Sequence, residues 1–356
     1  MIKWSPSRID AANYCIMRYY LKYYLKETPL RLSSYLKGNL LHTLVEEFWQ
    51  KLGQAHEVSK KGRKRYSNAE EFSAYAQRMW DYFCIRGENS KKPIFWNPEI
   101  GKKERWIIKK KLEEICYHLF PILVEEGPPL FSEKEFKFGL IGKIFTGFID
   151  EIRIKNGKAM IRDYKSGRPY MGEMKLDFDP QLTIYSVAIG AMAYENEEFA
   201  KKLGLEFQRK SFMGNPHYVV PNLQQEFFML EAPVKIAELK KQGKKLIPKV
   251  INVTTRTDNH FFEVIKMIDS VQERIITGNI VAERGRKCDF CDLKQVCKKK
   301  IDEVEIGSMK DKKGQFNLEF AVPFFARAEN KNIKKQKKQE KDPNQLRFYW
   351  RYKKLN

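Results

Sequence analysis

The segment Gly147-Phe148-Ile149-Asp150, followed by Ile161-Arg162-Asp163-Tyr164-Lys165, decides how this chain folds. Apolar residues predict strands over residues 143–154 and 158–165, and Asn156-Gly157 between them is typical of a tight hairpin turn. Such a hairpin brings Asp150 and Asp163 onto neighbouring strands of one sheet. Lys165 lies two residues beyond Asp163 and therefore on the same face of its strand.

Two carboxylates and a lysine at adjacent strand ends are typical of a site for a divalent cation and a phosphate. If Asp150 and Asp163 point to the same side of the sheet, they can share one Mg²⁺ or Mn²⁺. Such ions take few protein oxygens and complete their coordination with water or phosphate. Lys165 can then reach the phosphate or the attacking water. A surface hairpin with an ordinary salt bridge is the alternative, but the joint pattern of both strands favours the site.

The elements around this hairpin indicate an α/β fold. We expect helices over residues 6–27, 35–52, 69–85 and 102–125, so the first 125 residues are largely helical. A strand over 133–140 precedes the hairpin, and Asp179-Pro180 opens a helix that runs to residue 194. Short strands are expected near 206–212, 216–220 and 226–231, and a helix near 257–277.

Four short motifs, in this order along the chain, resemble the RecB-like branch of the PD-(D/E)xK nucleases. Members of that branch carry a helix with Gly and then His, a Gly-x-x-Asp strand, an Asp-Tyr-Lys-Ser strand and a Gln-x-x-x-Tyr helix. Here these are Gly38 to His42, Gly147 to Asp150, Asp163 to Ser166 and Gln181 to Tyr185. The resemblance covers residues 5 to 300. It implies a restriction-endonuclease-like core with a central mixed β-sheet flanked by helices, preceded by a helical N-terminal region.

The resemblance also implies what individual residues do. Asp150, Asp163 and the Tyr164 carbonyl are expected metal ligands, and His42 is expected as a further ligand. Lys165 is expected to orient or activate the water and to stabilise charge on the phosphate. The chemistry is then metal-assisted hydrolysis of a phosphodiester.

Two further sets of residues have open alternatives. Gln181 and Tyr185 lie four residues apart on one helix face, where the resemblance implies contact with a nucleic-acid strand. The alternative is an ordinary amphipathic helix with Tyr185 in the core. One of Glu133 and Glu135 can lie near the metal, although a solvated charge at a strand edge is the commoner outcome.

Three of the six cysteines, Cys288, Cys291 and Cys297, form the metal-ligand spacing C-x2-C-x5-C, and Cys15 is the candidate fourth ligand. A subgroup of RecB-like nucleases, the AddB-type and CRISPR adaptation nucleases, holds a [4Fe–4S] cluster with one N-terminal and three such C-terminal cysteines. This chain resembles that subgroup, except that Ile16 replaces the proline that usually follows the first cysteine. Zn²⁺ is the alternative, because four thiolates suit it equally well.

In either case, the metal site is expected to act structurally, as a clip that joins the N- and C-terminal parts of the chain. The remaining cysteines, Cys84 and Cys116, fall on predicted helices and are expected to be buried, inert thiols.

The formal net charge of +22 over 356 residues indicates an anionic partner. No apolar stretch reaches the roughly 18 residues of a membrane-spanning helix, and no apolar signal region opens the chain, so we expect a cytoplasmic protein with no membrane partner. Two basic segments, residues 60–65 and 347–354, can bind nucleic acid, and the second interleaves aromatic residues that suit stacking on a single strand. Solvated, disordered segments are the alternative.

The sequence thus predicts a metal-dependent exodeoxyribonuclease acting on single-stranded DNA or duplex ends, in DNA repair, recombination or CRISPR adaptation. Three segments are expected: a helical region over 1–125, a nuclease core with the cysteine cluster over 126–300, and a basic, partly disordered tail over 301–356. No G-x4-G-K-[ST] phosphate loop is present, so the chain acts alone or beside a separate helicase or other repair or adaptation proteins. The alternatives are a non-catalytic DNA-binding scaffold and an RNA-directed nuclease.

Overall fold

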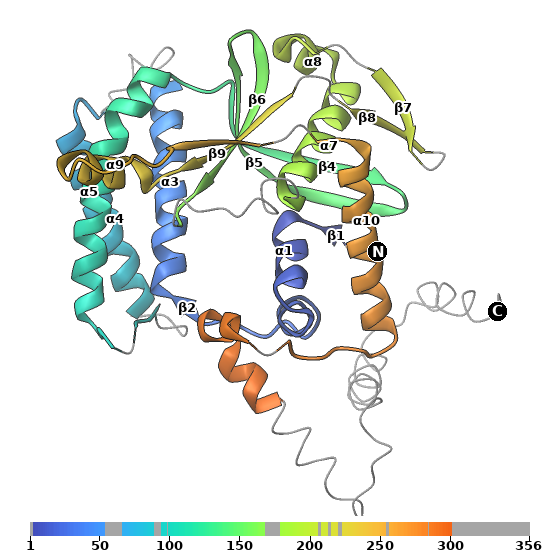
Figure 1. The fold of residues 1–356 in the computed structure, drawn as a ribbon, viewed down its shortest axis with the longest axis horizontal. Coiled ribbons are helices and arrows are strands. Elements are labelled where there is room, and N and C mark those ends of the chain that lie inside the picture. Colours follow the sequence, from blue (N-terminus) through green and yellow to red (C-terminus); the bar gives the residue numbers. More distant parts are fainter. Residues whose placement is uncertain are drawn as a thin grey trace, which may run out of the picture. The chain divides into compact units, whose positions relative to one another are not determined.

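The computed structural model describes residues 3–53, 66–88, 94–97, 99–167, 179–205, 208–212, 215–219, 223–253, 256–283 and 285–300 (Figure 1). The chain divides into two compact units: residues 1–11 with 28–267, and residues 12–27 with 268–356. The predicted basic segments 60–65 and 347–354 and the predicted tail over 301–356 lie outside the described residues. None of the described helices combines the length and the apolar composition needed to cross a membrane.

The first part of the chain is mostly helical, as predicted. Its elements are β1 (Lys3–Trp4), α1 (Pro6–Tyr14), α2 (Ile16–Tyr19), η1 (Tyr20–Tyr24), β2 (Arg31–Leu32), α3 (Ser33–Gly53), α4 (Ala69–Glu88), β3 (Ile94–Phe95) and α5 (Lys103–Glu126). The following elements alternate between strands and helices: β4 (Phe131–Leu140), β5 (Lys143–Lys155), β6 (Lys158–Lys165), α7 (Pro180–Glu195), α8 (Glu197–Leu203), β7 (Gln208–Phe212), β8 (Asn215–Val219), β9 (Gln224–Met229), α9 (Ala232–Lys241), β10 (Val250–Val253), α10 (Asp258–Ile276) and η2 (Arg286–Phe290).

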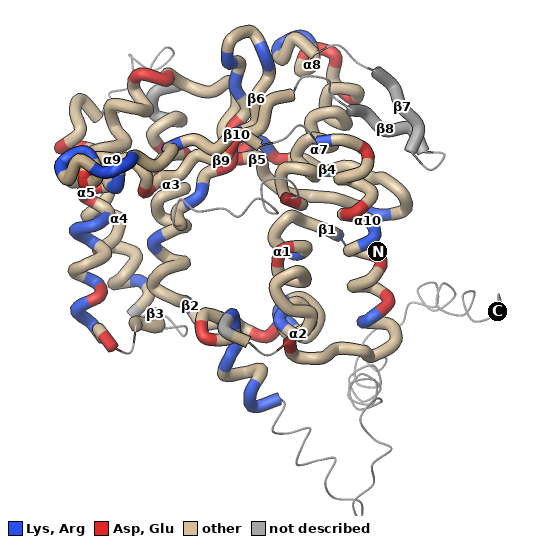
Figure 2. Tube along the Cα trace, in the orientation of Figure 1, with Lys and Arg blue, Asp and Glu red and all other residues tan. Residues whose placement is uncertain are grey.

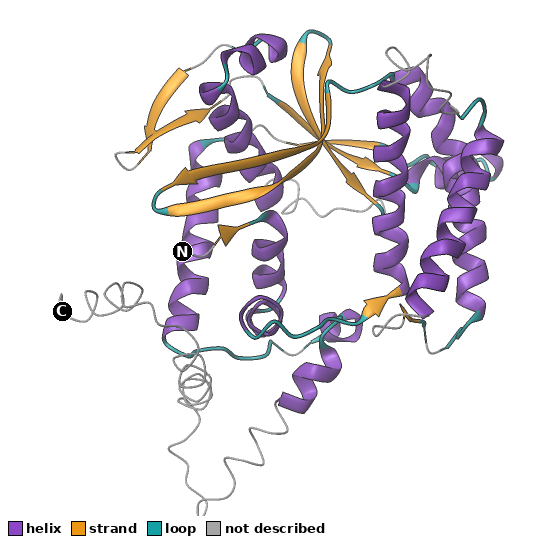
Figure 3. Cartoon of the chain, turned by 180° about the vertical axis from the view of Figure 1, so that it is seen from behind, coloured by secondary structure: helices purple, strands orange, loops and turns teal. Residues whose placement is uncertain are grey.

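A mixed sheet in the first unit has the strand order β1-β5-β6-β9-β10, with β4 on the other edge of β5 (Figure 3). The β4–β5, β5–β6 and β9–β10 pairs are antiparallel, and the β1–β5 and β6–β9 pairs are parallel. The parallel β6–β9 pair requires a crossover connection, in which α7 lies. The predicted α/β fold with a mixed central sheet flanked by helices is therefore confirmed.

Two tight turns set the register of the central strands. Asn156 and Gly157 have φ of 52° and 72°, and Ile141 and Gly142 have φ of 51° and 65°. Two consecutive residues with positive φ match the twist of a two-residue hairpin, which confirms the turn predicted at Asn156-Gly157. The turns pair Lys155 with Lys158 and Leu140 with Lys143.

Different helices cover the two faces of the sheet. Helices α3, α4 and α5 lie side by side and bury their apolar residues in one core with Tyr164 and Phe228 of the sheet (Figures 1 and 3). On the opposite face, the Gln225 side chain donates to the Leu182 carbonyl of α7 at 2.9 Å. Cys84 and Cys116 are fully buried, as predicted. Lys and Arg positions follow one another along α5 and α9 (Figure 2).

The sequence interpretation was wrong at several places. The single helix predicted over residues 6–27 is interrupted at Cys15, whose φ of −171° and ψ of 127° are those of extended chain. An extended residue stops the helical hydrogen bonds, and α2 begins at the next residue. Apolar periodicity does not register a one-residue interruption, because buried apolar residues such as Ala11 and Ile16 recur on both sides of it. The prediction also lacked α8, α9 and β10.

Candidate active site

Three carboxylates occupy one row across β4, β5 and β6. The pairs Ser132–Glu151 and Lys134–Ile149 place Glu133 opposite Asp150. On the other edge of β5, the pairing with β6 runs from Lys155–Lys158 to Glu151–Arg162. The next position along both strands places Asp163 opposite Asp150. Residues opposite one another in antiparallel strands have their side chains on the same face. The two turns therefore bring Glu133, Asp150 and Asp163 together.

The hairpin opens at this row. The pairing of β5 with β6 ends at Glu151–Arg162, whereas β6 continues beside β9 as far as Lys165. The Tyr164 amide donates to Asp150 Oδ2 at 2.8 Å, so the carboxylate satisfies a donor that the ladder leaves free. This hydrogen bond fixes the orientation of Asp150.

Like charges crowd around Asp150. Burial raises its pKa well above the usual value, the Asp163 carboxylate raises it further, and the Tyr164 amide opposes them. Burial, with Glu46 and then Asp163, raises the pKa of Glu133 to about 7. Clustered acids of this kind are neutralised either by taking up protons or by binding a cation.

Lys165 is the cation nearest to Asp163. Its ammonium lies 2.6 Å from Asp163 Oδ2 and donates to Gln181 Oε1 at 2.8 Å. The Gln181 amide donates in turn to the Tyr185 hydroxyl at 2.8 Å. Burial lowers the pKa of Lys165, but the carboxylates of Asp163 and Asp179 outweigh it and leave that pKa above its usual value. Lys165 therefore remains an ammonium.

The structure places Gln181 and Tyr185 behind Lys165. Tyr185 is only 3% exposed, and its ring packs edge-on against Phe136 with centroids 5.9 Å apart. Burial, with the Asp163 and Asp150 charges, raises its pKa. The contacts of this pair with Lys165 and Phe136 indicate that they hold the lysine in place.

His42 approaches the row from α3. Its Nδ1 lies 3.5 Å from Asp150 Oδ2, and its side chain is 32% exposed. Burial lowers the pKa of His42, with Asp163 opposing, so the neutral imidazole, which can ligate a metal, is favoured. A cavity of about 460 Å³ opens here, lined among others by Gly38, Glu46, Glu133 and Ser166. A Cβ on Gly38 would lie 2.6 Å from Ser166 Oγ, so a larger residue here would require the Ser166 hydroxyl to turn away.

The donor set suits a hard divalent cation. Within the described part of the chain, no three Asp, Glu, His or Cys side chains converge closely enough to hold a metal ion on their own. Mg²⁺ does not require that, because one or two carboxylates commonly hold it while water and phosphate oxygens complete the octahedron. Asp150 and Asp163, with the neutral His42 beside them, meet this requirement.

The four predicted ligand cysteines lie together in the second unit. Cys15, Cys288, Cys291 and Cys297 line one cavity of about 360 Å³, and none of these four cysteines is in a disulfide. The Tyr14 hydroxyl donates to the Lys287 carbonyl, and Arg18 Nε donates to Asp292 Oδ1 at 2.8 Å. These two hydrogen bonds join the segment that carries Cys15 to the segment that carries the other three cysteines. Burial raises the pKa of Cys291, and the Cys15 thiol adds to this.

Sequence interpretation missed Glu46 and favoured a solvated position for Glu133. Glu46 lies one helical turn after His42, at i+4 on the same face of α3, and this spacing was a usable signal. For Glu133 the signal was the register: counting back from the Ile141-Gly142 turn places it opposite Asp150.

Comparison with protein families gives a match over most of the chain. A family model described as the PD-(D/E)XK nuclease superfamily matches residues 3–298. Among curated proteins, no sequence matches the chain.

Proposed function

Because the chain belongs to the PD-(D/E)XK nuclease superfamily, we propose that it is a metal-dependent deoxyribonuclease with its active centre at the row of Glu133, Asp150 and Asp163. The observation that carries the proposal is the position of this acidic row beside Lys165 at an open cavity. The order of the motifs supports the RecB-like branch. A scaffold that only bound DNA would have no use for three crowded acids beside a lysine.

Each residue has a distinct part in this proposal. Asp150 and Asp163 hold the cation, with His42 and the Tyr164 carbonyl as further ligands. A bound Mg²⁺ or Mn²⁺ supplies polarisation of the scissile phosphate and a water of lowered pKa. Lys165, kept protonated by Asp163, cannot accept a proton from water. It stabilises the negative charge that develops on the phosphate.

The substrate we propose is single-stranded DNA or the end of a duplex, cleaved as an exonuclease. The cavity of about 460 Å³ lies in the range that small ligands fill, which suits one nucleotide of a strand. The net charge of +22 favours a polyanion. We place the activity in DNA repair, recombination or CRISPR adaptation, beside a separate helicase or other proteins of that pathway.

One assay tests the activity and its site. End-labelled single- and double-stranded DNA and RNA are incubated with Mg²⁺ or Mn²⁺, with wild type and with Asp163→Asn and Lys165→Ala. Removing a metal ligand costs several kcal/mol of transition-state stabilisation, so we expect at least a hundredfold loss of rate for Asp163→Asn. Matched controls are Asp10→Asn on α1 and Lys202→Ala on α8, both exposed and both expected to cleave normally.

Each outcome has a clear reading. Cleavage without metal, or full activity in Asp163→Asn, contradicts the site. Binding without cleavage by the wild type favours the scaffold, and cleavage of RNA in preference to DNA favours the RNA-directed enzyme. Release of single nucleotides from an end label supports the exonuclease, whereas internal cuts in circular DNA contradict it.

We further propose that Cys15, Cys288, Cys291 and Cys297 hold a [4Fe–4S] cluster with a structural role, a clip between the N- and C-terminal segments. The shared cavity and the absence of disulfides among these four cysteines support this proposal. Arg18 and Lys287 border the same cavity and place positive charge beside the thiolates.

Purified protein is then expected to be brown, with broad absorbance near roughly 400 nm. Cys291→Ser should lose colour and iron, while Cys84→Ala, which removes a buried thiol far from the cluster in sequence, should keep both. Colourless protein with one zinc per chain would identify the site as a zinc site instead.

A further inference from the structure

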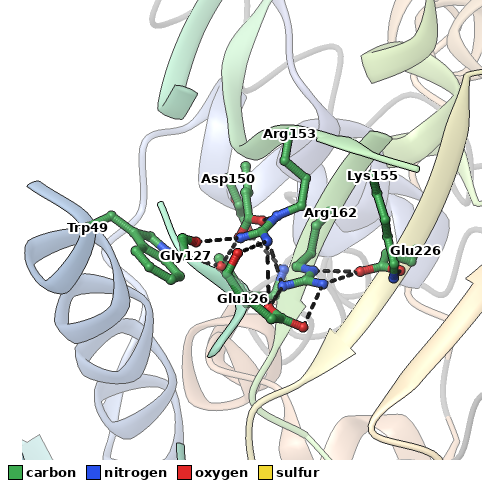
Figure 4. Close-up of polar contacts among 10 residues, drawn as sticks. Trp49, Glu126, Gly127, Asp150, Arg153, Lys155, Arg162 and Glu226 are labelled. Atoms are coloured by element: carbon green, nitrogen blue, oxygen red, sulfur yellow. Dashed lines mark hydrogen bonds and ion pairs between the residues drawn. The ribbon is translucent and has the colours of Figure 1, made fainter. Parts of the chain in front are cut away.

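The reverse face of the β5–β6 hairpin carries a buried ionic network. Arg162, only 1% exposed, lies at its centre: its Nη1 is 2.5 Å from Glu126 Oε2, and its Nε donates to Glu226 Oε1 at 2.6 Å (Figure 4). Glu151, fully buried, accepts a hydrogen bond from Arg153. Lys155 lies 3.2 Å from Glu226 Oε2. Three carboxylates thus face three cations.

Neighbouring residues of this network and of the acidic row lie on opposite faces of the sheet. Side chains alternate along a strand, so Glu151 points away from the face that carries Asp150, and Arg162 points away from that of Asp163. The network is therefore not part of the cavity. It lies directly beneath the residues that line the cavity.

Tyr164 connects the two faces. Its hydroxyl donates to Glu151 and accepts a hydrogen bond from Trp49 Nε1 at 3.2 Å. Its backbone amide donates to Asp150 Oδ2 at 2.8 Å on the other side. Burial and the Glu151 charge raise the pKa of Tyr164, so the hydroxyl keeps its proton and remains a donor.

Stability alone does not explain such a network. Burying ions costs several kcal/mol each, and well-packed apolar residues stabilise a core at least as well. The network does specify register. A slip of one residue between β5 and β6 would move Arg162 to the other face, leave Glu151 and Glu226 without it, and turn Asp163 away from Asp150.

We propose that Glu151 and Tyr164 are positioning residues for the metal site, an inference that rests on the proposed function. Glu151 holds the Tyr164 hydroxyl, and through it the Tyr164 backbone, so that the Tyr164 amide keeps Asp150 turned toward Asp163. The ionic network around Arg162 locks the strand register on which this arrangement depends.

Tyr164→Phe tests the proposal, because it removes one oxygen and keeps the ring and the amide. Removing a group that orients a metal ligand typically costs 10- to 100-fold in metal affinity or activity. We expect the Mn²⁺ dissociation constant, followed by the electron paramagnetic resonance signal of free Mn²⁺, to rise about tenfold. The kcat should fall while the KM for DNA stays unchanged.

Tyr75→Phe is the matched control. The Tyr75 hydroxyl also donates to a glutamate, Glu47, but within the α3–α4 pair and away from the hairpin. Both variants lose one tyrosine–carboxylate hydrogen bond, but Tyr164→Phe also removes the partner of Trp49 Nε1, so the unfolding free energy of each variant is measured alongside. Only Tyr164→Phe should weaken Mn²⁺ binding. Glu151→Gln is a second variant, expected to weaken Mn²⁺ binding as well.

The outcomes separate the two proposals. Wild-type Mn²⁺ affinity and kcat in folded Tyr164→Phe would overturn the positioning role and leave the nuclease intact. Equal losses in Tyr75→Phe and Tyr164→Phe would also overturn it, since the effect would then be general. Wild-type protein that binds no Mn²⁺ and cleaves nothing would overturn the proposed function, and the positioning role with it.

Discussion

Gly147, the first residue of the Gly-x-x-Asp motif, leaves no space for a side chain. A Cβ at this position would lie 2.8 Å from Phe136 Cζ, 3.0 Å from Phe136 Cε1 and 3.3 Å from Pro6 Cδ. Phe136 pairs directly with Gly147 across β4 and β5 and is 2% exposed. We therefore expect Gly147→Ala to destabilise the protein.

The magnitude follows from two opposing effects. To restore ordinary contact at about 3.4 Å, the Phe136 ring must move by about 0.6 Å, and it is held by Phe138 at 6.0 Å and Tyr185 at 5.9 Å between centroids. Overpacking of this kind costs about 1–3 kcal/mol. Replacing glycine with alanine lowers the conformational entropy of the unfolded chain, which stabilises the folded protein by about 0.4–1 kcal/mol. Overpacking prevails, and we expect a net loss of about 1–2 kcal/mol in unfolding free energy.

Activity should fall with stability. A displaced Phe136 presses on Tyr185, whose hydroxyl supports Gln181 and through it Lys165. Folded Gly147→Ala should therefore cleave DNA more slowly than wild type at a temperature well below its unfolding transition.

Urea unfolding measures the stability change, and Gly139→Ala is the control. A Cβ on Gly139, in the same sheet, would meet only the Lys143 carbonyl, at 4.0 Å. Phe136→Leu in the Gly147→Ala background should relieve the contact, so the double variant is less destabilised than the two single changes added together. If Gly147→Ala is as stable as Gly139→Ala, the packing explanation is wrong. It is also wrong if the stability losses of Gly147→Ala and Phe136→Leu simply add in the double variant.

Three further outcomes follow from single contacts. Asp179 caps α7 by accepting from the Leu182 amide at 3.0 Å, so Asp179→Ala should cost about 1 kcal/mol in urea unfolding, and Asp179→Asn should cost less. Burial raises the pKa of Glu126, but the Arg162 guanidinium outweighs it and leaves that pKa below 4.5. The stability that Glu126 contributes is therefore present above pH 4.5 and lost as the pH falls. In Glu126→Gln, the unfolding free energy should depend less on pH in this acid range. Mn²⁺ at a hundred times its dissociation constant should stabilise the wild type by about 2.7 kcal/mol in thermal unfolding, and the effect should vanish in Asp163→Asn.

Local signals in the sequence were sufficient to predict the β5–β6 hairpin. Asn156-Gly157 can adopt positive φ at both positions, so the turn and the register on either side of it follow from two residues. The same counting from Ile141-Gly142 yields the position of Glu133. The positions of Glu133, Asp150 and Asp163 in one row can therefore be predicted from the sequence, by counting the strand pairs back from both turns.

Long-range contacts were not accessible in that way. β10 is a four-residue strand whose existence depends on β9, which lies more than twenty positions earlier. The break at Cys15 follows an exposed Asn13 and a half-buried Tyr14, and no Gly or Pro marks it. The contact of Tyr164 with Glu151 depends on which face of β6 meets the helices, and the pattern of a strand buried on both faces does not specify this.

The two faces of the β5–β6 hairpin carry different arrangements of charge: an excess of carboxylates on one face and matched ion pairs on the other. On the face that carries Asp150 and Asp163, like charges lie close together and Lys165 neutralises them only in part, which favours binding of the proposed divalent cation. On the opposite face, three carboxylates and three cations balance, and their ion pairs favour the observed register of β5 and β6. The ion pairs on the opposite face hold β5 and β6 together, because repulsion between Asp150 and Asp163 would otherwise separate these two strands where their pairing ends.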